Sequence, residues 1–189
     1  FYFSDQLINT EPALMTNKYE NAEISEMIKQ RSVLVIGPGL RLDDANLVMN
    51  NYISRDLVMV IDAGALHALP KNYDFNNQCI LTPHIGEAAM LLNQSNEYVM
   101  SHPIASAMAL YKNFNTSIVL KAASTIIVFN GQVSVVTNGD SNLATAGSGD
   151  VLAGMLGGYI ASYGLKKHII EHVVFRHADI GKIWSQTKK

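Results

Sequence analysis

The chain of 189 residues has the size of one domain, and its content of 48% hydrophobic and 16% charged residues excludes a disordered protein. A net charge of −2 with no basic block excludes recruitment of nucleic acid or of an anionic membrane by bulk charge. The single Cys79 excludes an intramolecular disulfide, and no apolar run reaches the ~18 residues that span a bilayer, so we expect a cytoplasmic location.

Short apolar runs predict strands that are buried on both faces. They cover residues 33–36, 57–61, 79–81 and 118–120, and Gly, Asp, Thr-Pro or Lys follows each run. Continuous rather than alternating hydrophobicity is typical of a parallel sheet that helices cover on both sides. Helical patterns lie between the runs, over residues 43–54, 86–92 and 104–114. This alternation predicts an α/β layered domain.

The alternation of strand and helix patterns changes after residue 121. Two β-rich runs, 125–129 and 133–137, flank Asn130-Gly131, a strong signal for a tight hairpin. We therefore expect the sheet to turn antiparallel at one edge. Two helical segments follow, over 148–161 and 167–184. Because the chain contains no linker or repeat, we expect a single domain over residues 1–189.

The glycine-rich stretch before the first of these helices is the best candidate for a functional site. Gly147, Ser148 and Gly149 place small residues where a helix begins, and its exposed N–H groups and positive dipole end suit a phosphate. Asp150 follows in the first turn. It could merely complement the helix dipole. A carboxylate beside a phosphate site is better explained as a base that deprotonates a hydroxyl about to attack the phosphate.

This stretch, Asn138 to Gly154, resembles the Asn-x-Gly…Ala-Gly-(Thr/Ser)-Gly-Asp-x-Leu-x-Gly signature of the ribokinase-like superfamily, and specifically the NAD(P)H-hydrate dehydratase family. Further segments resemble that family in the same order: Glu11-Pro12-Ala13-Leu14-Met15, Val35-Ile36-Gly37-Pro38-Gly39-Leu40, Ile61-Asp62-Ala63-Gly64-Ala65-Leu66, Leu81-Thr82-Pro83-His84-Ile85-Gly86-Glu87 and Val119-Leu120-Lys121.

The resemblance implies an α/β fold of the ribokinase-like type, a three-layer α/β/α sandwich with a mostly parallel sheet and an antiparallel edge hairpin. It implies a hydro-lyase that uses ADP or ATP, with Mg²⁺, to dehydrate hydrated NADH or NADPH. It also implies a homo-oligomer, since the family often forms tetramers. The choice between ADP and ATP, and between the two hydrates, stays open.

The resemblance also implies roles for individual residues. Asp150 would take the proton from the ring hydroxyl of the substrate, while the hydroxyl attacks the terminal phosphate. The anion hole and nucleotide site would comprise Lys121, Ala122, Ala123, Ser124, Thr125, Asn142, Ala146, Gly147, Ser148 and Gly149. The substrate would meet Gly39, His84, Glu87, Asp62 and Asp150. We expect no metal cage made of the chain's own side chains.

From the residues alone, three of these positions have plain alternatives. Lys121 would also fit an exposed strand-end lysine, and His84 a structural or solvated histidine. Asp62 ends a buried strand, where an unpaired charge is costly, so it lines the cleft or caps the next helix. For His168, His172 and His177 on the final helix we expect no functional role.

The chain departs from the family pattern at three points. Arg41 and Ala122 stand where the family usually has glycine, and at Ala122 we expect strain if the backbone needs a positive φ. By analogy with the family, about 60 residues of the domain precede the segment that begins at Glu11, and they are missing here. If so, one wall of the cleft is open and we expect weak activity.

Two other functions remain open. A ribokinase-like kinase for a small alcohol, of the hydroxyethylthiazole or hydroxymethylpyrimidine type, would use the same anion hole and base but release a phosphorylated product. A non-catalytic nucleotide-binding module would use the anion hole alone. The loops at residues 37–40 and 82–87 favour the dehydratase over the kinase.

Overall fold

The computed structural model describes residues 31–53, 57–71, 73–139 and 147–187. The description below concerns the unit that residues 33–189 form. The predicted single domain over 1–189 includes residues 1–30, which lie outside the described part, so it stays a prediction.

A six-stranded sheet with the order β1-β2-β3-β4-β5-β6 forms the centre of this unit. Strands β1 to β4 are parallel, whereas β5 and β6 continue the sheet antiparallel to their neighbours. Asn130 (φ 48°) and Gly131 (φ 73°) form the turn between β5 and β6, and the positive φ at both residues is what a tight hairpin turn requires. The strands are β1 (Val33–Ile36), β2 (Val58–Ile61), β3 (Cys79–Leu81), β4 (Ser117–Leu120), β5 (Thr125–Phe129) and β6 (Gln132–Val136).

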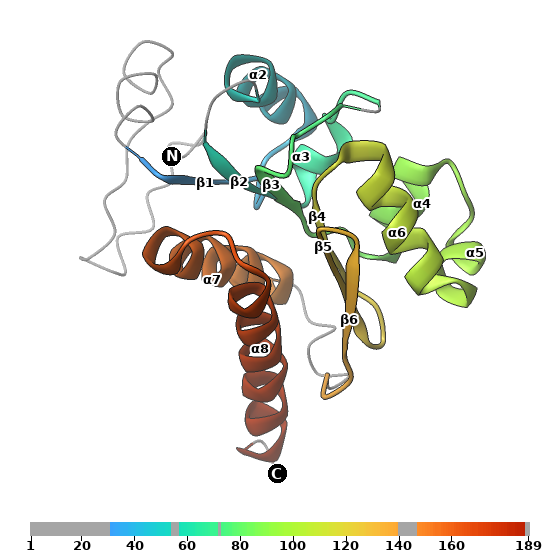
Figure 1. Ribbon diagram of the computed structural model, residues 1–189, viewed down its shortest axis with the longest axis vertical. Coiled ribbons are helices and arrows are strands. Elements are labelled where there is room, and N and C mark those ends of the chain that lie inside the picture. The colour runs from blue at the N-terminus through green and yellow to red at the C-terminus, as the bar shows by residue number, and fades with distance from the viewer. Residues whose placement is uncertain (1–30, 54–56, 72, 140–146, 188–189) are drawn as a thin grey trace. The chain divides into compact units, whose positions relative to one another are not determined.

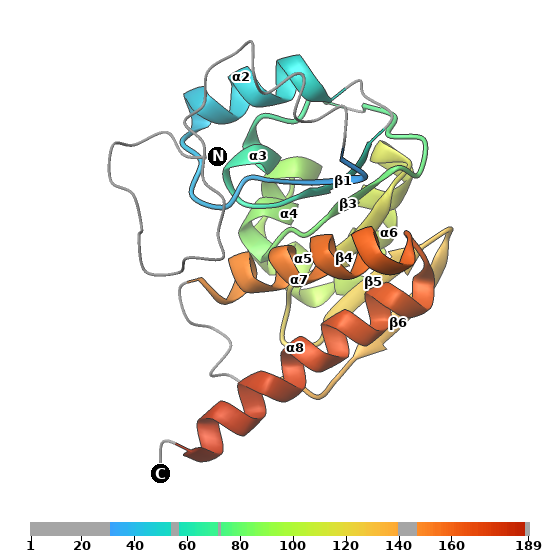
Figure 2. The same cartoon turned by 90° about the vertical axis from the view of Figure 1, so that its left-hand side faces the viewer.

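Helices cover both faces of the sheet (Figure 1). Helices α7 and α8 pack on one face, and the helices from α2 to α6 lie on the other, as the turned view also shows (Figure 2). The predicted three-layer sandwich with its antiparallel edge is therefore confirmed. The helices are α2 (Leu42–Tyr52), α3 (Gly64–His67), α4 (Ile85–Leu92), α5 (Asn96–Ser101), α6 (Pro103–Phe114), α7 (Ser148–Tyr163) and α8 (Lys167–Thr187).

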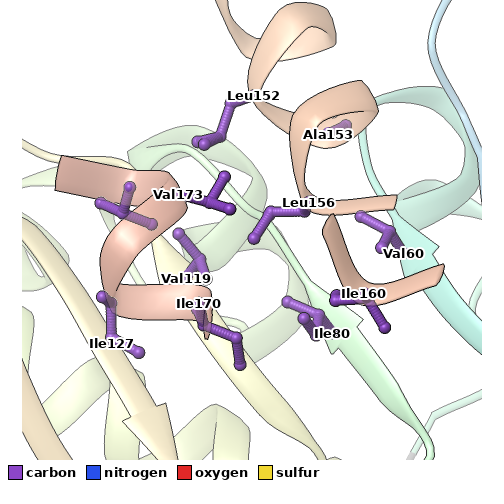
Figure 3. Packing of buried hydrophobic residues seen from close by; sticks show 11 residues of the cluster. Val60, Ile80, Val119, Ile127, Leu152, Ala153, Leu156, Ile160, Ile170 and Val173 are labelled. Atoms are coloured by element: carbon purple, nitrogen blue, oxygen red, sulfur yellow. The ribbon is translucent and has the colours of Figure 1, made fainter. Parts of the chain in front are cut away.

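The core between the sheet and the α7/α8 layer fixes where α7 lies. Figure 3 shows side chains of α7 and α8 packed against those of the central strands; the cluster contains Val60, Ile80, Val119, Ile127, Leu152, Ala153, Leu156, Ile160, Ile170, Val173 and Val174. At Gly157 the helix approaches β1 so closely that a Cβ atom would lie 2.3 Å from Cγ2 of Val35. A side chain at residue 157 would therefore require Val35 or α7 to shift.

The helices of this unit were also compared with what a membrane-spanning helix requires. Among the residues that the structure describes, we find no helix whose length and hydropathy would allow it to cross a bilayer.

Candidate active site

The carboxyl ends of the parallel strands bring two predicted site residues together. The Nζ atom of Lys121, which follows β4, lies 2.7 Å from Oδ1 of Asp62, which follows β2. The Asp62 side chain is 1% exposed and that of Lys121 22% exposed. A carboxylate this deeply buried needs a charged partner, and Lys121 supplies it. The N-cap of α3 is Ala63, so Asp62 pairs with a lysine rather than capping that helix.

The loops around Asp62 are held by close backbone contacts. A Cβ atom on Gly37, whose φ is 122°, would lie 1.6 Å from the Asp62 carbonyl oxygen, so only glycine fits there. Gly39 has a φ of 70°, and a Cβ there would meet nothing within 4 Å. Gly37 therefore forms the tight contact in this loop, whereas Gly39, which sequence analysis placed beside the substrate, borders open space.

Ala63 adopts a backbone conformation that residues other than glycine rarely adopt. Its φ is 45° and its ψ is −125°, close to the first central position of a type II′ turn, which favours glycine. The Ala65 N–H donates to the Asp62 carbonyl oxygen across this turn at 3.1 Å. Backbone strain is thus stored directly beside the buried carboxylate, as is common at functional sites.

The N-terminus of α7 faces the same pair. Gly147 is its N-cap, with a φ of 87°, and this residue has no side chain with which to cap the helix. A Cβ placed on Gly149 would lie 3.1 Å from Nζ of Lys121 and 3.7 Å from Oδ2 of Asp62. The first N–H groups of a helix have no acceptor within the helix, and the dipole makes this end positive. Backbone donors and a lysine therefore converge where an anion would bind.

Asp150 lies in the first turn of α7, one residue beyond Gly149, and its side chain is exposed. An exposed carboxylate is accessible to a bound ligand. The role of Asp150 as the base stays a prediction.

His84 and Glu87 have structural partners. The Nδ1 atom of His84 accepts from the N–H groups of Gly86 (2.9 Å) and Glu87 (3.2 Å), while the Glu87 carboxylate accepts from the His84 N–H at 2.8 Å. Together they form a capping box at the start of α4. Because Nδ1 accepts from the backbone, Nε2 is the ring nitrogen that donates, and it lies 3.4 Å from Oε1 of Glu87.

This cap is also tied to the lysine. The Lys121 N–H donates to the Pro83 carbonyl oxygen at 2.8 Å, and His84 and Lys121 form a parallel bridge beyond the ends of β3 and β4. The structure therefore brings Asp62, His84, Glu87, Lys121 and the start of α7 to one edge of the sheet.

The expectation of strain at Ala122 is wrong. Ala122 is not among the residues with a positive φ, so alanine fits this backbone as well as glycine would. Ala123, Ser124 and Thr125 continue from it into β5. The predicted nucleotide-binding residues Asn142 and Ala146 lie outside the described residues.

Sequence analysis missed His177, which reaches the site from α8. Its Nε2 atom lies 2.9 Å from the Ser148 carbonyl oxygen. The pKa of His177 is lowered, chiefly by burial. Its hydrogen bond to Ser148 opposes this shift, and the nearby Lys121 ammonium adds to it. No spacing rule links residues this far apart, so only the fold could reveal the contact. Within the described ranges, no three His, Cys, Asp or Glu side chains gather as a metal site.

Comparison with known proteins agrees with this geometry. Residues 4–189 match the family model described as NAD(P)H-hydrate dehydratase. A bifunctional NAD(P)H-hydrate repair enzyme Nnr from Thermofilum pendens is 32% identical over 94% of this chain, which covers 36% of that relative. The chain thus spans about a third of the length of this bifunctional relative.

Solved structures show the same likeness. An ADP/ATP-dependent NAD(P)H-hydrate dehydratase from Bacillus subtilis, co-crystallised with ATP/Mg²⁺, is 27% identical with a TM-score of 0.73, over 82% of this chain and 56% of that one. A hydroxyethylthiazole kinase from Pyrococcus horikoshii, 18% identical with a TM-score of 0.67 over 90% of this chain and 70% of that one, shares the fold alone. By its match to the family model over nearly its whole length, the chain belongs to the NAD(P)H-hydrate dehydratase family.

Proposed function

We propose that this chain dehydrates hydrated NADH or NADPH at the expense of ADP or ATP, with Asp150 as the general base. One observation carries the proposal: an exposed carboxylate stands in the first turn of a helix whose N-terminus faces the Lys121 ammonium. This arrangement places a base one residue from backbone N–H groups that can stabilise the negative charge of a phosphoryl group. Membership of the family supports the choice of substrate.

In this proposal each residue has a distinct chemical role. Asp150 accepts the proton of the ring hydroxyl, whose oxygen attacks the terminal phosphorus as the bond from phosphorus to the leaving nucleotide oxygen breaks. The N–H groups at the start of α7 stabilise the negative charge that develops on the phosphoryl oxygens. Lys121, whose Nζ would lie 3.1 Å from a Cβ on Gly149, would share that charge. The ring nitrogen lone pair expels phosphate from the neighbouring carbon and leaves an iminium. The next ring carbon then gives a proton to water, which restores the C=C bond and the neutral nitrogen.

Mg²⁺ would supply additional charge neutralisation on the nucleotide phosphates. Mg²⁺ is usually held by one or two carboxylates together with substrate phosphates, so we expect the ion to bind together with the nucleotide. No step above depends on a metal ligand from this chain. As further parts of the proposal, we infer a cytoplasmic location and a homo-oligomeric assembly. A density gradient or light scattering of the purified chain would test the assembly.

The test is a turnover assay. The chain is mixed with hydrated NADH, Mg²⁺ and either ADP or ATP, and the recovery of reduced-nicotinamide absorbance is followed. Recovery that requires nucleotide and yields one phosphate per NADH supports the proposal. Transfer of phosphate to a small alcohol, with no recovery of absorbance, would instead identify a kinase of the same fold.

A further inference from the structure

The contact between His177 and the start of α7 fixes the chemical form of the histidine. The Ser148 carbonyl oxygen can only accept a hydrogen bond, so Nε2 of His177, 2.9 Å away, carries the proton. The half-buried ring stands near the Lys121 ammonium, and both its burial and this charge oppose a second proton on Nδ1. His177 is therefore a neutral donor with its proton on Nε2.

This bond controls the direction of a neighbouring donor. The Ser148 carbonyl and the Gly149 N–H belong to one planar peptide group and point in opposite directions. A bond that holds the carbonyl oxygen toward α8 therefore turns the Gly149 N–H away from α8. A carbonyl oxygen has two lone pairs, so the bond to His177 leaves one for the hydrogen bonding of the helix.

The backbone here needs such a restraint. Gly147 and Gly149 flank Ser148, and glycine has more conformational freedom than any other residue. Gly147, the N-cap residue, has no side chain with which to cap the helix. The hydrogen bond from α8 thus restrains the peptide between two flexible residues, where a Cβ on Gly149 would lie 3.1 Å from Nζ of Lys121.

We propose that His177 is a positioning residue, which orients the Ser148–Gly149 peptide so that the Gly149 N–H points at the bound phosphoryl group. The inference rests on the proposed function in one respect, since it takes the start of α7 to be the phosphate site. In this role His177 acts through the backbone of Ser148 and needs no contact with nucleotide or substrate.

The test compares two replacements of His177. Glutamine carries an Nε2 donor at a similar distance along the side chain, whereas leucine fills similar space without a donor. Affinities for ADP and for adenosine are measured by calorimetry. We expect His177→Leu to weaken ADP binding about fivefold to tenfold, the effect of one misaligned hydrogen bond, and to leave adenosine binding unchanged. His177→Gln should restore the affinity for ADP.

Control variants come from the same helix. His168 is exposed on α8, so His168→Leu and His168→Gln should both bind ADP like the parent chain. Equal ADP affinity in His177→Leu and the parent chain would overturn the proposal. So would equal losses for ADP and adenosine, because a general disturbance of the fold would affect both, and so would a failure of glutamine to rescue.

Nuclear magnetic resonance tests the same contact without any ligand. The ¹⁵N shifts of the His177 ring, assigned by their absence in His177→Gln, should report a neutral ring with the proton on Nε2 at pH 7. A proton on Nδ1 instead would overturn the proposal. Neither readout needs turnover, so a chain that binds ADP but does not dehydrate hydrated NADH would contradict the proposed function and leave the role of His177 to be decided by these measurements.

Discussion

The Lys121 ammonium lies 2.7 Å from the Asp62 carboxylate, and this pair joins the ends of two strands that are 59 residues apart in the chain. Asp62 is almost completely buried, whereas Lys121 keeps access to the space before α7. One lysine thus neutralises the buried carboxylate and faces the proposed phosphate site.

Removal of the lysine should therefore affect both stability and binding. Lys121→Met leaves the Asp62 carboxylate buried without its partner, which should lower the free energy of unfolding by about 3 kcal/mol. ADP affinity should fall as well, because a positive charge beside the phosphates is lost. Urea denaturation and calorimetry measure the two effects.

The double variant Lys121→Met/Asp62→Asn supplies the control. It removes both charges, so it should recover most of the lost stability but none of the ADP affinity. If Lys121→Met unfolds at the same urea concentration as the parent chain, the pair does not contribute to stability as its burial indicates.

The strained backbone at Ala63 predicts a stabilising substitution. Ala63→Gly places the residue without a Cβ in a conformation that favours it, and this should raise the stability by about 1 kcal/mol. For a chain of this size, the melting temperature should rise by about 3 °C. Ala68→Gly, at a residue with a φ of −93°, is the matched control and should not stabilise the chain. A fall in melting temperature for Ala63→Gly would show that the turn is not strained.

His177 also predicts a dependence of stability on pH. Its pKa is lowered in the folded protein, from an ordinary value of 6.5, chiefly by burial. The unfolded chain therefore takes up a proton at this residue first as the pH falls, and protonation favours the unfolded state. The stabilising contribution is complete above pH 6.5 and is lost as the pH falls below it.

The variant His177→Gln isolates this contribution. Between pH 7 and pH 5 its free energy of unfolding should decrease less than that of the parent chain, in urea titrations at matched ionic strength. Identical slopes in the two proteins would mean that His177 titrates alike in the folded and unfolded states.

Local patterns predicted the fold well because they act over short distances. The continuous apolar runs gave strands β1 and β3 with their observed ends, and Asn130-Gly131 gave the hairpin. The short helices α3 and α5 were not predicted, since four to six residues are too few to show a helical period.

The candidate site was predicted less completely, because its contacts depend on the fold. The sequence showed that Asp62 and Lys121 each end a strand, but only the parallel order of β2, β3 and β4 brings them together. His177 carried no signal, since it contacts a carbonyl group and every residue has one. For His84 the sequence left a structural, a solvated and a functional role open, and the structure shows the capping box.

The most direct test is the variant Asp150→Asn, with turnover of hydrated NADH and affinity for ADP measured on the same preparation. Asparagine retains the shape of the side chain but cannot accept the hydroxyl proton. Turnover should fall at least about 100-fold, the usual contribution of a general base, while ADP binds as tightly as before or more tightly, because a negative charge beside the phosphates is removed. Turnover that survives this substitution would contradict the assignment of Asp150 as the base.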